Sequence, residues 1–170
     1  MPIADRANRR QPAATPYQER LRAIGHRLDS GGWRVLCLLE DQANLVVSAT
    51  RSGDTADGAH EVLTLRLSPP LVRRVGAEAR RWRGRRWTAP ALATGPAGSG
   101  YQARLRAVGW LCDTRGLREF RLTEEGDNLL LAARREAPTA ADRPLAHYRL
   151  TPEDIEALLR HLAGLRGAQP

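Results

Sequence analysis

The sequence predicts an α+β fold in which one small unit occurs twice: a helix, a three-stranded antiparallel meander and a closing helix. Aligned against itself at an offset of 84 positions, segment 17–51 is identical to segment 101–135 at 16 of 35 positions, without a gap. After a loop one residue shorter in the second copy, residues 66–69 (RLSP) match residues 149–152 (RLTP). Register held over this length predicts a tandem duplication.

The size of the unit predicts how the copies are arranged. Three strands and two helices are too few to bury a core alone, so we expect the copies to pack about a pseudo-twofold axis as a dimer within one chain. The expected organisation is a disordered basic tail (1–16), a first repeat (17–87), an Ala/Gly/Pro linker (88–100) and a second repeat (101–167).

Each copy is expected to open with a helix that buries one face. Apolar residues recur at helical spacing, and hydroxyl residues precede both helices as candidate N-caps. The stripes are Tyr17, Leu21, Ile24 and Leu28 in the first copy and Tyr101, Leu105, Val108 and Cys112 in the second, and the candidate caps are Thr15 and Ser99. Glycines then end each helix, and the apolar period changes to two.

The first strand differs between the copies. In the second copy Phe120 and Leu122 alternate with polar residues, which predicts one wet face. In the first copy Val35, Cys37 and Leu39 are apolar as well as the residues between them, so both faces of that strand are apolar. The additional apolar face could be covered by the other copy, by another chain or by a closing helix.

A closing helix follows each meander, beginning at a hydroxyl residue and proline. Its expected core stripe contains Val72, Val75, Ala79 and Trp82 in the first copy and Ile155, Leu158 or Leu159, Leu162 and Leu165 in the second.

Composition restricts the class of protein. No apolar run is long enough to cross a bilayer and the first residues lack the apolar core of a signal peptide, so we expect a cytoplasmic protein without membrane contact. The two cysteines, Cys37 and Cys112, are expected to be buried free thiols. The net charge is +8, and every basic residue is arginine. Complete absence of lysine is also typical of a GC-rich genome, so the charge alone is a weak indication of an anionic partner.

Catalytic and metal motifs are missing from the sequence. The histidines have no Cys or His neighbour at ligand spacing, no phosphate-binding glycine loop is present, and we expect neither a cofactor nor an enzyme. Glu40 with Glu124 and Asn44 with Asn128 recur in both copies, but they flank hairpin turns, where polar residues serve turn chemistry. A deep pocket between the copies, lined by these repeated residues, would favour an enzyme instead.

The strongest functional signal is the end of the first copy, residues 73–87, which holds seven arginines and two tryptophans against one acid. Clustered guanidinium groups neutralise phosphates, and tryptophan can stack on a base, so this segment predicts binding to DNA or RNA. The candidate nucleic-acid-binding residues are Arg73, Arg74, Arg80, Arg81, Arg83, Arg85, Arg86 and Trp87. The alternative is a helix whose arginines are merely solvated.

A second hypothesis is a protein-interaction adaptor or chaperone-like module. In element order, two helix-meander-helix units paired about a twofold axis resemble the architecture of small dimeric secretion chaperones. The resemblance implies that Val35, Cys37 and Leu39 form an exposed apolar surface for a partner protein or for a second copy of the chain.

Overall fold

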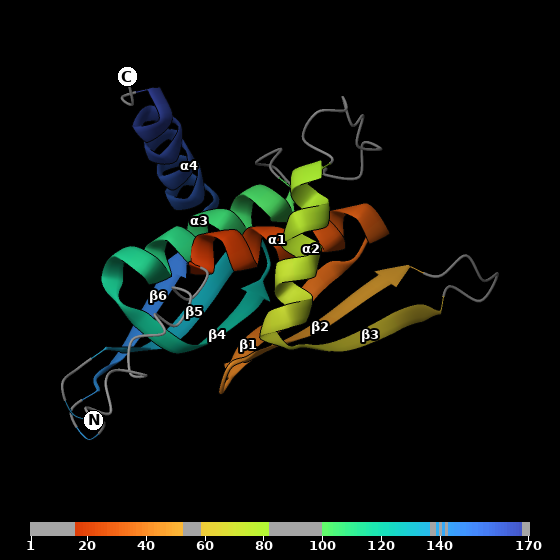
Figure 1. The fold of residues 1–170 in the computed structure, drawn as a ribbon, viewed down its shortest axis with the longest axis horizontal. Coiled ribbons are helices and arrows are strands. Elements are labelled where there is room, and N and C mark those ends of the chain that lie inside the picture. Colours follow the sequence, from red (N-terminus) through yellow and green to blue (C-terminus); the bar gives the residue numbers. More distant parts are fainter. Residues whose placement is uncertain are drawn as a thin grey trace, which may run out of the picture.

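The computed structural model describes residues 16–52, 59–81, 100–136, 139, 141 and 143–167. Within these ranges the chain forms four helices and one six-stranded antiparallel sheet (Figure 1), which confirms the α+β class. The expected tail and linker lie outside the described residues, except for their last residues, Pro16 and Gly100.

The elements follow one another in the expected order. They are α1 (Tyr17–Gly31), β1 (Arg34–Asp41), β2 (Asn44–Ser52), β3 (His60–Leu67), α2 (Pro69–Arg81), α3 (Tyr101–Arg115), β4 (Leu117–Glu125), β5 (Asn128–Arg135), β6 (Leu145–Leu150) and α4 (Pro152–Gly167).

The sheet has the strand order β3-β2-β1-β4-β5-β6. Each meander therefore contributes three adjacent strands, and the two meanders meet where β1 pairs with β4. Leu38 lies opposite Leu122 at this junction, and both side chains are fully buried. The junction joins the two meanders into one continuous sheet.

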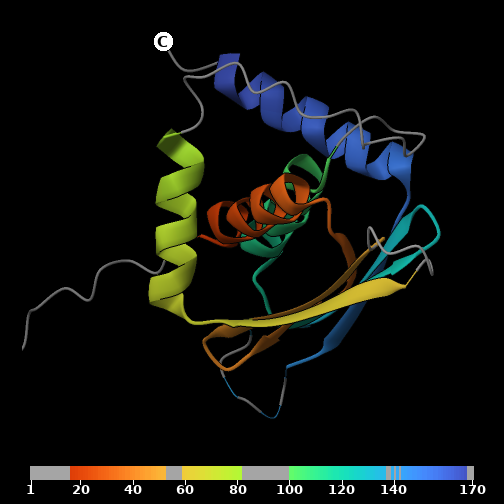
Figure 2. The ribbon, with the colours of Figure 1, turned by 90° about the vertical axis from the view of Figure 1, so that its right-hand side faces the viewer.

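All four helices lie on the same side of the sheet, as Figure 2 shows. Helices α1 and α3 cross its centre, α2 contacts α1, and α4 contacts α3. The expected stripes of α1 and α3 are confirmed as core: Leu21, Ile24, Leu105 and Val108 are each at most 2% exposed. On the outer helices the core includes Val72, Ile155 and Leu162, whereas Trp82 lies outside the described residues.

The starts of α1 and α3 differ from the expected hydroxyl caps. The N-cap positions are Pro16 and Gly100, and neither offers a side-chain cap. Instead, the backbone N–H groups of Tyr101 and Gln102 donate to the carboxylate of Asp29, near the end of α1, at 2.9 Å each. A carboxylate beside a helix N-terminus satisfies unpaired amides and interacts favourably with the helix dipole.

The reciprocal bonds are present at the other helix. The N–H groups of Tyr17 and Gln18 donate to Asp113 of α3, again at 2.9 Å. Each central helix therefore carries the acceptor for the first turn of the other, and local sequence gave no sign of this.

Candidate interaction surfaces

The sheet face opposite the helices forms the broadest candidate surface, and no described helix covers it (Figure 2). Two neighbouring rows of side chains cross all six strands on this face. From β3 to β6, one row is Arg66, Val46, Leu39, Arg121, Ala132 and His147, and the other is Thr64, Ser48, Cys37, Thr123, Leu130 and Arg149. We call these twelve residues the open sheet face.

The open sheet face is basic and partly apolar. It holds three arginines and no acid. Arg66 forms an ion pair with Asp41 at 2.9 Å, whereas Arg121 and Arg149 are exposed and have no carboxylate within 4.0 Å among the described residues. Leu39, Val46 and Leu130 are half-buried between them.

Two large apolar side chains extend this face at its edges. Val62 on β3 is 69% exposed and Leu145 on β6 is 56% exposed. They lie on the two edge strands: Val62 is opposite Thr50 of β2, and Leu145 is opposite Arg134 of β5. Exposed aliphatic side chains at both edges add to the apolar area available to a ligand.

The three residues expected to form an apolar partner surface are separated by a β-bulge. Cys37 and Leu39 both lie on the open sheet face and are half-buried. Val35 precedes the bulge and pairs with Ala49, a buried position, while Cys37 pairs with Ser48. The structure thus brings Cys37 together with Leu39, and the register of Val35 differs from theirs.

The arginine-rich segment is described only in part. Arg73 and Arg74 are exposed on α2, next to the buried Val72, so their charges face solvent. Arg80 and Arg81 belong to the last turn of α2, and their side chains are not described. Arg83, Arg85, Arg86 and Trp87 lie outside the described residues.

The recurring glutamates hold the first tyrosine of each central helix. The hydroxyl of Tyr17 donates to Glu40 at 2.6 Å, and that of Tyr101 donates to Glu124 at 2.9 Å. Burial and the hydrogen bond to Glu40 raise the pKa of Tyr17 well above its usual range. Each carboxylate thus holds a central helix to the sheet. The sequence could have indicated this role, because the tyrosines and the glutamates recur at the same offset of 84 positions.

The remaining chemical groups of interest are the potential metal ligands and the two thiols. The described ranges contain no group of three or more His, Cys, Asp or Glu side chains that could hold a metal ion. Both cysteines are free thiols, as expected. Cys112 is buried, as predicted, whereas Cys37 is only half-buried because it lies on the open sheet face. Burial raises the pKa of Cys112 to about 12, so this thiol remains protonated and unreactive near neutral pH.

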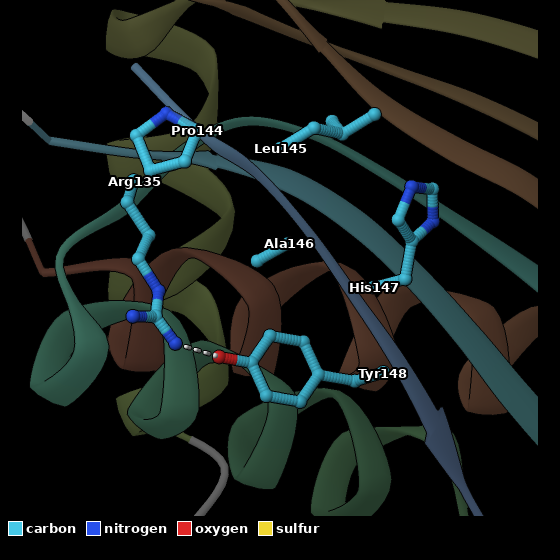
Figure 3. Close-up of a pocket in the computed structure, with 6 residues that line it drawn as sticks. All are labelled: Arg135, Pro144, Leu145, Ala146, His147 and Tyr148. Carbon is cyan, nitrogen blue, oxygen red and sulfur yellow. Dashed lines mark hydrogen bonds between the residues drawn. The ribbon is translucent and has the colours of Figure 1, made fainter. Parts of the chain in front are cut away.

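A shallow cavity of about 310 Å³ lies along the edge strand β6. Its lining consists of Arg135, Pro144, Leu145, Ala146, His147 and Tyr148 (Figure 3). The Arg135 guanidinium and the Tyr148 hydroxyl point toward each other on one side, 3.5 Å apart, and His147 lies on the other. The cavity lies at one edge of the sheet, and none of the repeated residues Glu40, Glu124, Asn44 and Asn128 lines it.

No protein-family model matches the chain, and comparisons with curated proteins and with solved structures find no match. No helix in the described ranges is long and apolar enough to cross a membrane. The function therefore has to be argued from the surfaces themselves.

Proposed function

We propose that this protein is a non-enzymatic adaptor that binds an acidic, amphipathic segment of a partner protein on its open sheet face. The observation that carries the proposal is the composition of the two rows, which contain aliphatic side chains and three arginines but no acid. One of these arginines, Arg66, is balanced by Asp41 beside the rows. Arg121 and Arg149 have charges that no described carboxylate balances. A ligand with carboxylates spaced around apolar residues complements this pattern.

The dimensions of the face favour an elongated ligand. Adjacent strands lie about 4.8 Å apart, so six strands span roughly 24 Å, and the two rows are about 7 Å from each other. A helix about 10 Å in diameter, laid across the strands, would cover both rows over about 16 residues. Neither row contains a Phe, Tyr or Trp side chain, and the imidazole of His147 is the one ring in the two rows, which makes base stacking a poor alternative here.

We also infer that the chain is a tandem duplication whose halves pack about a pseudo-twofold axis. Support comes from reciprocal contacts at matching positions: Asp29 and Asp113 each cap the other central helix. The close approaches of a glycine to the other helix match as well: Gly25 lies against Tyr101 and Gln102, and Gly109 lies against Tyr17 and Gln18. The open sheet face would then consist of two halves that run in opposite orientations, one from each copy. The half from the first copy is more apolar, with Cys37 and Leu39, and the half from the second copy is more polar, with Arg121 and Thr123 at the matching positions.

A second candidate function is binding of DNA or RNA by the arginine-rich segment 73–87. The observation that favours it is the division of α2, in which Val72 is buried while Arg73 and Arg74 are exposed. Such a helix presents its positive charge outward, as phosphate binding requires.

One experiment compares the two candidates. The probes are a labelled 16-residue helical peptide of Leu, Ala and Glu, the same peptide with Gln for Glu, and labelled single-stranded and duplex oligonucleotides across a salt series. The variants are Arg121→Gln with Arg149→Gln, and, as a control with the same charge change, Arg73→Gln with Arg74→Gln.

We expect the acidic peptide to bind and the first variant to weaken it by about fivefold to thirtyfold, since two exposed ion pairs contribute about 1–2 kcal/mol together. The Gln peptide should bind more weakly, and the α2 variant should bind the acidic peptide as the unmodified protein does. If only the oligonucleotides bind, with a steep salt dependence that the α2 variant reduces, the nucleic-acid candidate replaces the adaptor.

A further inference from the structure

Arg51 and Arg135 occupy matching positions near the two edges of the sheet, but their surroundings differ. At the first edge, Arg51 at the end of β2 forms an ion pair with Glu61, its cross-strand neighbour on the edge strand β3. The guanidinium of Arg51 also lies 4.4 Å from the ring centre of Trp33. The charge of this arginine is therefore balanced from within the chain.

At the second edge the balancing carboxylate is missing. Arg135 matches Arg51, and its backbone N–H donates to the carbonyl of Pro144 at 3.0 Å, so Pro144 stands where Glu61 stands at the first edge. No carboxylate lies within 4.0 Å of Arg135 among the described residues. The adjacent Glu136 is directed to Arg118, at 3.5 Å.

The space beside Arg135 is open. The cavity of about 310 Å³ lies here, with Arg135 and Tyr148 on one side (Figure 3). At about 30 Å³ per water molecule this volume equals roughly ten waters, enough for an acidic side chain and part of its backbone. The Tyr148 hydroxyl is 3.5 Å from the Arg135 guanidinium and can also donate to an anion placed between them.

The strand that forms this edge is also able to accept another strand. β6 is the last strand of the sheet, and no described strand pairs with its outer side. Its side chains alternate between the two faces, with Leu145 exposed on one and Ala146 half-buried on the other. An unpaired strand edge offers N–H and C=O groups for β-augmentation.

We infer that the β6 edge is a binding site for an extended protein segment carrying a glutamate or aspartate, whose side-chain carboxylate takes the place beside Arg135 that Glu61 takes beside Arg51. The added strand makes backbone hydrogen bonds to β6. Its carboxylate accepts from the Arg135 guanidinium and the Tyr148 hydroxyl, while a neighbouring apolar side chain contacts Leu145. This site shares strand β6 with the open sheet face, but its cation, Arg135, is not one of the twelve residues of that face.

The test uses a labelled, acetylated pentapeptide amide, Thr-Val-Glu-Val-Thr, and its counterpart with Gln in place of Glu. Arg135→Gln removes the cation, whereas Pro144→Glu supplies an internal carboxylate at the place of Glu61. Arg51→Gln is the matched control, since it makes the same change at the first edge. Binding is measured by fluorescence anisotropy, and circular dichroism melts report whether each variant is folded.

We expect both Arg135→Gln and Pro144→Glu to weaken binding of the Glu peptide at least tenfold, equivalent to about 1.4 kcal/mol. Arg51→Gln and the open-face variant Arg121→Gln, which lies on β4 away from this edge, should bind it as the unmodified protein does. Failure of this site can therefore be told apart from failure of the adaptor proposal. Equal affinity for the Glu and Gln peptides, undiminished binding by Pro144→Glu, or no binding at all would overturn the inference. If the melting curve shows that a variant is not folded, the unmodified protein is studied instead by NMR. The Nε–Hε resonance of Arg135 should then shift when the Glu peptide is added and should not shift with the Gln peptide.

Discussion

Replacement of Gly25 by alanine tests a close approach in the core, where α1 crosses the start of α3. A Cβ atom at position 25 would lie 2.6 Å from the backbone N and Cα of Gln102, and these atoms cannot rotate away as a side-chain tip can. Overpacking a core lowers the free energy of unfolding by about 1–3 kcal/mol, and we expect about 3 kcal/mol here because the obstructing atoms belong to the backbone. The higher helix propensity of alanine offsets about 1 kcal/mol. We therefore expect the free energy of unfolding to fall by about 2 kcal/mol and Tm to fall by roughly 4–8 °C.

The chain offers a matched control for this substitution. Gly164 of α4 has no heavy atom within 4 Å of the position that its Cβ would take. Gly164→Ala should therefore raise the free energy of unfolding by about 0.5–1 kcal/mol, because only the helix propensity changes. Urea and thermal unfolding followed by circular dichroism measure both variants. The proposed close approach is refuted if Gly25→Ala proves as stable as the unmodified protein or more stable.

Two further predictions concern the helix caps and the buried thiol. Asp29→Ala removes the acceptor of two first-turn amides of α3 and should lower the free energy of unfolding, measured by urea denaturation, by about 1–2 kcal/mol. As a control, Glu156→Ala on the exposed side of α4 should change this free energy by under about 0.5 kcal/mol. Equal effects of the two substitutions would contradict the capping role of Asp29. Cys112, whose pKa burial raises to about 12, keeps its proton in the folded state, while the unfolded thiol loses it above about pH 8.5. Its contribution to stability should therefore decline as pH rises from about 8.5 toward 12, and iodoacetamide at pH 8 should modify the half-buried Cys37 first; equal labelling rates in the folded protein would argue against this burial.

The elements themselves were predictable because their signals are local. Leu21, Ile24 and Leu28 repeat at the period of a helix, and the structure buries all three. The alternation of Phe120 and Leu122 with polar residues likewise predicted a strand with one covered face, and both side chains are buried under the helices. Such patterns depend on neighbours a few positions away, which the sequence shows directly.

The caps and the candidate sites depended on residues far apart in the chain. Asp29 caps a helix that begins 72 residues later, so the hydroxyl at position 99 was a natural but local expectation. The β-bulge that separates the register of Val35 from that of Cys37 leaves no distinct pattern in the strand. The arginine-rich segment was evident from composition alone, whereas the unbalanced charge of Arg135 becomes visible only beside Pro144 and Tyr148.

By itself the sequence determined the α+β class, the order of the elements and the apolar side of each helix, because these follow from periodicity and from residues that begin or end helices. Only the tertiary structure decided that β1 pairs with β4 and that all four helices share one side of the sheet. Strand edges pair through backbone groups that nearly every residue carries, so sequence does not specify which edges meet. In the described part of the chain, that arrangement leaves the arginines of the open sheet face and the outer edge of β6 uncovered by any other helix or strand.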